Sequence, residues 1–211
     1  MEIFLGLGNG LFKKRQTYPT GSRSLSGVVG NFNGDGNIDI ILATHSSSSS
    51  AIRLFKGNGD GTFSKPISFS KNLSPLILIT KDMNNNGLQD LVFSSGQGDN
   101  MYMLVSRGDG TFESEIVFSG GGGPTSLTAG DFNSDNMIDV AVANSRSSNF
   151  SFIARRADGL FQHPTRDSLV DGGTPLAITS GDFNNDSMAD IAVASNAKNT
   201  IEIYLQRRVF K

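Results

Sequence analysis

Cysteine and tryptophan are absent from this sequence of 211 residues, and histidine occurs only twice, at His45 and His163. Without cysteine, the chain can form no disulfide and perform no thiol chemistry. Neither histidine is paired with a nucleophile by any sequence motif, so we expect no catalytic residues and no enzymatic activity. No apolar run approaches the roughly 20 residues that span a bilayer, so we expect no membrane insertion of this segment.

An excess of charge of one sign is also missing. The 18 Lys and Arg residues nearly balance the 20 Asp and Glu residues, which leaves a net charge of −2. This balance gives no broad attraction to nucleic acid or to an anionic membrane, so we expect neither as a partner. The first ten residues, MEIFLGLGNG, lack the basic segment, the long apolar core and the cleavage site of a signal peptide.

Acidic residues are concentrated in four similar stretches. These nine-residue loops are NFNGDGNID (31–39), DMNNNGLQD (82–90), DFNSDNMID (131–139) and DFNNDSMAD (182–190), and they begin 51, 49 and 51 residues apart. A second motif has nearly the same period: GNGLF (8–12), GNGDGTF (57–63), RGDGTF (107–112) and ADGLF (157–161). Two motifs that share one period indicate a structural repeat of about 50 residues.

The sequence pattern of each repeat predicts four short strands. Segments such as PLAITS (175–180), ADIAVA (189–194) and TIEIYL (200–205) are β-branched or apolar and are bounded by Gly, Asn and Ser. A fourth strand is expected to open with the Phe of the second motif, after a glycine turn of the kind that joins hairpins. Four strands per repeat indicate an all-β fold of β-propeller blades, about four four-stranded antiparallel sheets, in a segment of a larger propeller.

The repeat limits define one repeat domain over 1–211. The repeats are 1–24 (partial), 25–70, 76–118, 127–168 and 177–211. The last repeat must take its outer strand either from RRVFK (207–211) or from LFKKRQTY (11–18), and the second choice would be a strand swap that closes a ring. The absence of tryptophan argues against Kelch repeats, and the 50-residue period argues against nine-residue calcium β-helices.

The acidic loops carry oxygen at fixed positions. Their seventh position varies freely (Asn37, Leu88, Met137 and Met188), as expected if only its backbone carbonyl acts. The side chains at positions one, three, five and nine are all Asp or Asn: Asn31, Asn33, Asp35 and Asp39; Asp82, Asn84, Asn86 and Asp90; Asp131, Asn133, Asp135 and Asp139; Asp182, Asn184, Asp186 and Asp190.

An all-oxygen set of this kind suits Ca²⁺, a hard cation with six to eight ligands, better than zinc or magnesium. The alternative is a set of Asx-turns, in which the side chains cap their own backbone. An EF-hand is excluded, because the twelfth position is never Glu and strands flank the loops. Loops one and two have only two carboxylates each, so we expect them to bind the ion more weakly.

Two further loop positions carry structural predictions. The sixth position (Gly36, Gly87, Asn136 and Ser187) suits a left-handed backbone conformation, with some strain at Ser187. The second position is apolar in every copy and is expected to anchor the loop in the core: Phe32, Met83, Phe132 and Phe183.

The phrases GDFNNDSMADIAVA and GDFNSDNMIDVAVA, joined to GNGDGTF, resemble the FG-GAP/VCBS repeat family. That family includes the calcium-binding blades of integrin α-subunit propellers and many secreted repeat proteins. The resemblance covers nearly the whole chain, and it implies a propeller with Ca²⁺ bound between the first two strands of each blade. It also implies an extracellular or cell-surface location. The departures from the family pattern are Asn31 and Asn86.

We therefore expect a calcium-stabilised, non-catalytic binding or adhesion module whose ligand is a protein or a glycan. The alternative is a carbohydrate-binding, lectin-like module or an accessory domain of a larger secreted enzyme. The tripeptide RGD at 107–109 lies where a sibling repeat has GNGDGTF, so we interpret it as a hairpin turn and not as an adhesive motif.

Overall fold

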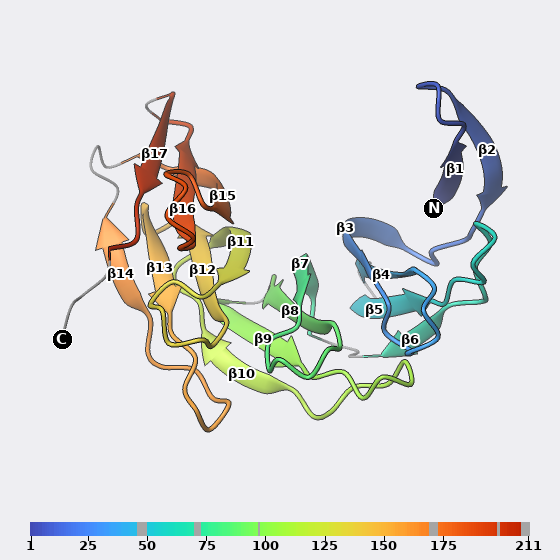
Figure 1. Cartoon of the computed structure of the whole chain (residues 1–211), viewed down its shortest axis with the longest axis horizontal. Coiled ribbons are helices and arrows are strands. Elements are labelled where there is room, and N and C mark those ends of the chain that lie inside the picture. Colours follow the sequence, from blue (N-terminus) through green and yellow to red (C-terminus); the bar gives the residue numbers. More distant parts are fainter. Residues whose placement is uncertain (46–49, 70–72, 97, 169–172, 198, 208–211) are drawn as a thin grey trace.

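The structure is a computed structural model of the chain, and it describes residues 1–45, 50–69, 73–96, 98–168, 173–197 and 199–207. All regular secondary structure in these residues is β-strand (Figure 1), and no helix in them is long and apolar enough to cross a membrane. The predicted all-β fold of propeller blades is confirmed.

Within the described residues, the strands form four successive antiparallel blades and one hairpin. The hairpin consists of β1 (Glu2–Gly6) and β2 (Phe12–Thr17). The blades consist of β3 (Arg23–Gly30), β4 (Asp39–His45), β5 (Ser50–Phe55) and β6 (Ile67–Phe69); β7 (Pro75–Lys81), β8 (Asp90–Ser95), β9 (Asn100–Leu104) and β10 (Ile116–Ser119); β11 (Pro124–Gly130), β12 (Asp139–Asn144), β13 (Asn149–Ile153) and β14 (Thr165–Ser168); and β15 (Pro175–Gly181), β16 (Asp190–Ser195) and β17 (Thr200–Tyr204). That the whole of 1–211 forms one domain stays a prediction.

The second strand of the two middle blades is covered on both sides. Every residue of β8 and of β12 is buried. In β12, Val140 and Val142 pack against the preceding blade, whereas Ala141 and Ala143 pack against the following one. The sequence of a strand with both faces buried is a continuous apolar run, which explains the IAVA-type segments.

The hydrophobic core is divided among the junctions between successive blades. One cluster joins the first and second blades, a second cluster joins the second and third, and a third cluster joins the third and fourth. Since each blade buries its faces only against its neighbours, the fold is a stack of similar junctions. Figure 1 shows the resulting arc, with the β1–β2 hairpin at one end and the β15–β17 blade at the other.

The acidic loops lie at one fixed place in this architecture. Each loop joins the first strand of a blade to the second, and its ninth residue pairs with the last residue of the first strand. These register pairs are Gly30 with Asp39, Lys81 with Asp90, Gly130 with Asp139, and Gly181 with Asp190.

The fourth strands begin later than predicted. Phe63, Phe112 and Phe161 form isolated bridges to Gly57, Ser106 and Arg155, and the strands start only at residues 67, 116 and 165. In two blades a proline directly precedes the strand, at residues 66 and 164, and proline cannot donate a hydrogen bond to a sheet. Only Phe12 opens a strand, because the N-terminal hairpin continues directly into β2.

The predicted strand swap is also wrong for the N-terminal segment. Residues 12–17 form β2, which pairs with β1 in a two-stranded sheet and not with the last blade. A chain that already has an antiparallel partner five residues away gains its hydrogen bonds locally, at a lower entropic cost than by closing a ring. The alternative outer strand, RRVFK, lies almost entirely outside the described residues.

A matched glycine pair tests the close packing at the end of the third strand. A Cβ at Gly57 would lie 2.1 Å from the carbonyl oxygen of Ile38, whereas at the equivalent Gly6 its nearest neighbour would be a Phe12 ring atom at 3.8 Å. We expect Gly57→Ala to reduce the free energy of unfolding by about 1–3 kcal/mol, because the backbone must shift. Gly6→Ala should change it by less than about 0.5 kcal/mol. Urea denaturation of both variants measures the difference, and equal stabilities would contradict it.

Candidate metal-binding loops

The ninth residue of each loop is a fully buried aspartate that holds two distant parts of the blade together. In the first blade, Asp39 Oδ2 accepts the N–H of Phe32 at 2.9 Å, and its Oδ1 accepts the N–H of Gly57, also at 2.9 Å. The first bond closes the loop, and the second ties it to the end of the third strand. The same pair of bonds recurs at Asp90, Asp139 and Asp190.

The side chains at positions one, three and five turn onto the backbone of their own loop. In loop four, Asp182 accepts the N–H groups of residues 186 and 187, and Asn184 accepts that of residue 186. Asp186 accepts the N–H of Met188 at 2.9 Å and the side-chain amide of Asn184 at 2.8 Å. Loop three repeats this pattern throughout. The oxygens therefore gather around one tight turn, as in the Asx-turn alternative.

Two positions in every loop adopt the left-handed conformation. The sixth position has φ of 84° at Gly36, 83° at Gly87, 65° at Asn136 and 66° at Ser187, which confirms the prediction. The fourth position is left-handed as well, with φ of 74° at Gly34 and 62° at Asn185, and the sequence analysis did not identify it. The residue types at position four (Gly, Asn, Ser, Asn) carried that signal, because Gly and Asn favour this region.

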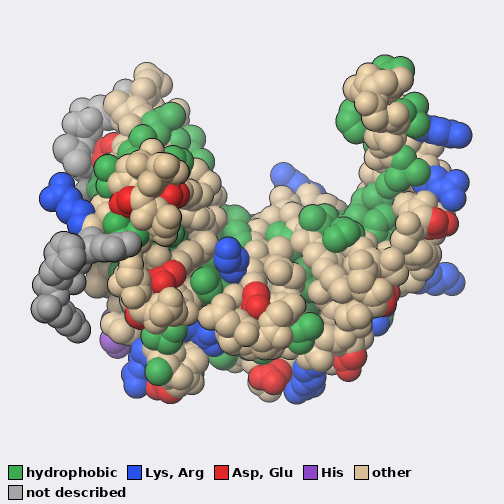
Figure 2. Space-filling view, in the orientation of Figure 1, with side chains coloured by type: hydrophobic (Ala, Val, Ile, Leu, Met, Phe, Trp, Pro, Cys, Tyr) green, Lys and Arg blue, Asp and Glu red, His purple; other side chains and the backbone are tan. Residues whose placement is uncertain are grey.

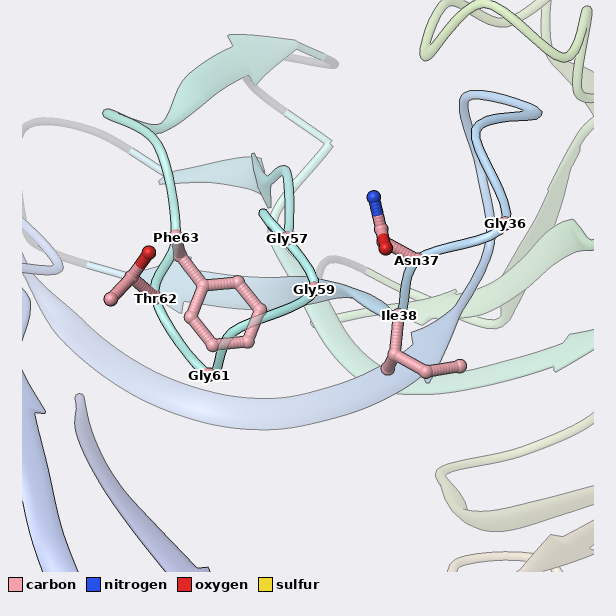
Figure 3. Close-up of a pocket in the computed structure, with 8 residues that line it drawn as sticks. All are labelled: Gly36, Asn37, Ile38, Gly57, Gly59, Gly61, Thr62 and Phe63. Atoms are coloured by element: carbon pink, nitrogen blue, oxygen red, sulfur yellow. The ribbon is translucent and has the colours of Figure 1, made fainter.

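The seventh position contacts the glycine turn of the second motif, so the two sequence motifs meet in space. A Cβ at Gly59 would lie 2.6 Å from Asn37 Oδ1, and one at Gly108 would lie 3.2 Å from the Leu88 side chain. Figure 3 shows the first of these contacts, in a pocket of about 310 Å³ where Asn37 and Ile38 project to opposite sides. Glycine is favoured at this turn because its φ is 82° at Gly59 and 77° at Gly108, a left-handed conformation that side chains strain.

Successive blades are tied together across the loops. The backbone N–H of Gly110 in the second blade donates to the carbonyl of Phe32 at 2.9 Å. In the third blade, the buried Arg155 donates to the carbonyl of Met83, which is the equivalent residue of loop two. Both bonds link a loop to the blade that follows it.

The carboxylates of one loop interact electrostatically. Burial raises the pKa of Asp139 to about 6. Hydrogen bonds from Arg155 and Phe132 oppose this shift, while Asp135 and Asp131 add to it by repulsion. Burial also raises the pKa of Asp90, and Asp82 adds to that shift. A nearby cation would relieve this repulsion.

Whether the loops can bind a metal ion depends on whether their oxygens have lone pairs that no hydrogen bond uses. The donors are all carboxylate or amide oxygens, which suits a hard cation, and an oxygen that accepts one N–H keeps a second lone pair. Among the described residues, however, no group of three or more Asp, Glu or His side chains is placed to hold a metal ion. The donor types therefore suit calcium, but in this structure the loop oxygens accept N–H groups of their own loop and are not arranged around an ion.

The second loop position anchors the core in only part of the chain. Phe32 and Met83 are fully buried, and Phe132 packs against the third cluster. Phe183 is 46% exposed, so the prediction is wrong for the last blade. The reason is positional, because in the other blades this residue packs against the next blade along the chain.

The RGD tripeptide forms the hairpin turn that its sibling repeats have. Gly108 has φ of 77°, and Asp109 Oδ1 accepts both the N–H and the hydroxyl of Thr111, at 2.7 and 2.6 Å. The hydroxyl bond is the main cause of the lowered pKa of Asp109.

One histidine does contact a potential nucleophile, contrary to the sequence analysis. His45 Nδ1 lies 2.7 Å from Ser50 Oγ. The two residues are cross-strand partners at the end of the β4–β5 pair, and sequence spacing alone could not show this register. Such a pair is a normal sheet contact.

Comparison with known proteins identifies the family of this chain. The profile of the FG-GAP-like repeat matches residues 31–93, 82–142 and 131–193, so the chain belongs to the FG-GAP-like repeat family. No curated protein matches it. Among solved structures, it is similar to the V. cholerae biofilm matrix protein Bap1, with 15% sequence identity and a TM-score of 0.42. That match covers 86% of this chain and 38% of the Bap1 chain.

The buried ninth-position aspartate can be tested by removing its acceptors. Asp39→Ala leaves the N–H groups of Phe32 and Gly57 without this partner, and each such group costs about 1–3 kcal/mol. We expect a total loss of about 2–5 kcal/mol in urea denaturation with EDTA present. Asp60→Ala is the control, since Asp60 is exposed, accepts hydrogen bonds from nearby Thr62 and otherwise forms an exposed ion pair with Arg15 at 3.7 Å. A loss at residue 39 no larger than at residue 60 would refute the structural role.

Proposed function

We propose that this chain is a non-catalytic binding or adhesion module whose blades are stabilised by Ca²⁺ in the four acidic loops. The observation that carries the proposal is the fourfold recurrence of one oxygen-rich turn at the same place in each blade. Membership of the FG-GAP-like repeat family supports it. The ligand is a protein or a glycan, and the module acts at the cell surface or outside the cell.

The proposed ligands are the oxygens at positions one, three, five and nine, with the carbonyl of position seven. Bound calcium supplies positive charge to a turn in which several carboxylates repel one another. The chain's own part would be to bring these oxygens together around the ion, and the two left-handed residues of each loop and its buried aspartate support this role by closing the turn. Loops three and four, with three carboxylates each, bind more tightly than loops one and two.

Calcium binding predicts a change in thermal stability. An ion that binds only the folded state at 100 times its Kd stabilises that state by about 2.7 kcal/mol per site. We therefore expect the melting temperature of the chain to be higher in excess calcium than in EDTA, with a smaller effect from magnesium. An unchanged melting temperature would refute the proposal.

Substitutions at position five assign the effect to particular loops. Asp135→Asn and Asp186→Asn remove a carboxylate but retain an acceptor for the N–H groups of Met137 and Met188, and loop two already has Asn86 there. The double variant should lose most of the calcium-dependent rise in melting temperature. Its melting temperature in EDTA should be nearly the same as that of the wild type. Asp158→Asn, in a hairpin turn outside the loops, is the matched control. An equal effect of the control would contradict the assignment.

A groove lined by residues of the second, third and fourth blades favours a second candidate, glycan binding. It has a volume of about 380 Å³, and it combines the cation Lys81 and the acids Asp131 and Asp182 with an apolar wall that includes Ile138 and Met188. Polar groups of both signs beside an apolar wall can bind the hydroxyls and the ring face of a sugar.

The two ligand classes can be separated with the same protein. The chain is applied, in calcium and in EDTA, to a glycan array and to a panel of immobilised extracellular matrix proteins. Calcium-dependent binding to the proteins alone supports adhesion. Glycan binding that Lys81→Ala weakens at least tenfold supports the lectin alternative, and Lys65→Ala, outside the groove, is its control.

A further inference from the structure

The first two junctions between blades use the same three positions. The face of a blade that meets the next blade, here called its forward face, carries the second loop residue and two residues of the third strand. In the first blade these are Phe32, Ile52 and Leu54, and all three are fully buried against the second blade. In the second blade, Met83, Met101 and Met103 are likewise fully buried.

The forward face of the last blade has the same chemistry but is uncovered. Strand register identifies Ile201 and Ile203 as the counterparts of Ile52 and Leu54 in the first blade. Ile201 pairs with Ala194 and Ile203 with Ala192, just as Ile52 pairs with Ala43. The exposed fractions are 72% for Ile201, 56% for Ile203 and 46% for Phe183. An apolar cluster of this kind is typical of a contact surface.

The N-terminal hairpin is the corresponding half of a blade. Its turn matches the turn of the second blade: the Leu7 N–H donates to the Leu11 carbonyl at 2.9 Å, as that of Arg107 donates to Thr111 at 3.0 Å. Gly8 and Gly10 have φ of 81°, close to the 77° and 86° of the two turn glycines at 108 and 110. The hairpin therefore has the conformation that, in the second blade, docks on a forward face.

The hairpin also exposes the apolar residues that would make this contact. Gly6 pairs with Phe12 as Ser106 pairs with Phe112, so Phe4 and Phe12 correspond to Leu104 and Phe112. Leu104 is 2% exposed and packs against the first blade, whereas Phe4 is 53% exposed and Phe12 is 69% exposed. Figure 2 shows hydrophobic side chains at both ends of the arc.

The junction of the first and second blades shows how such surfaces fit. The rings of Phe32 and Phe112 have their centroids 6.2 Å apart, and the Gly110 N–H donates to the Phe32 carbonyl. The corresponding pairs at the ends of the chain are Phe183 with Phe12 and the Phe183 carbonyl with the Gly10 N–H. In one molecule these residues lie on opposite ends of the arc (Figure 1).

We propose that the forward face of the β15–β17 blade binds the β1–β2 hairpin of a second copy of this chain. The contact reproduces the junction between the first two blades, so its geometry and residue types already exist within each molecule. It is a head-to-tail contact between two different surfaces, and such contacts produce either closed rings or longer chains of subunits.

Sedimentation velocity on the full chain over a range of concentrations tests the proposal. We expect the wild-type mass to exceed 22.5 kDa and to rise with concentration. The variant Ile201→Glu/Ile203→Glu and the variant Phe4→Glu/Phe12→Glu should each remain monomeric, since each lacks one of the two surfaces. All four side chains are exposed, so both variants should retain the wild-type circular dichroism.

Mixing the two variants separates a head-to-tail contact from a symmetric one. Each variant retains the surface that the other lacks, so an equal mixture should form dimers of twice the 22.5 kDa mass and nothing larger. The control is Val117→Glu, which changes a 53% exposed residue on β10 and should assemble like the wild type. A monomeric wild type, a mixture that stays monomeric, or a control that dissociates equally would each overturn the proposal.

Discussion

The buried aspartate at the end of each acidic loop is the contact on which the rest of the blade depends. Its two oxygens accept N–H groups from the start of the loop and from the end of the third strand, which lie 7 residues before it and 16 to 18 residues after it. Without it, two buried N–H groups would lose their acceptor, and the loop would lose its direct hydrogen bond to the end of the third strand. The same residue thus serves the fold and the proposed ion site.

Much of the architecture could be predicted from the sequence because it is encoded locally and repeated. The alternation of ADIAVA-type strands with Asp- and Asn-rich turns is visible within 15 residues, and four copies reinforce each other. The left-handed sixth position could be predicted for the same reason, since Gly36, Gly87 and Asn136 share one backbone preference. Family membership over 31–193 agrees with this local pattern.

Several features that sequence analysis missed depend on where a residue lies in the folded sheet. The exposure of Phe183 follows from its place in the last blade, although its sequence context matches that of the buried Phe32. The late start of the fourth strands depends on isolated bridges that only the folded sheet defines. The contact between His45 and Ser50 follows from strand register. Only the late fourth strands have a local signal, the proline that directly precedes the strand at residues 66 and 164.

The division of the core into clusters, each between two neighbouring blades, has an evolutionary consequence. Because no cluster among the described residues spans three blades, an in-frame duplication or deletion of one 50-residue unit would create a junction of the kind already present on either side. Unequal recombination between the repeated segments could therefore change the length of the arc in single steps, with every intermediate still able to fold. Repeat number in such a gene is expected to vary more readily than the residues that form each junction.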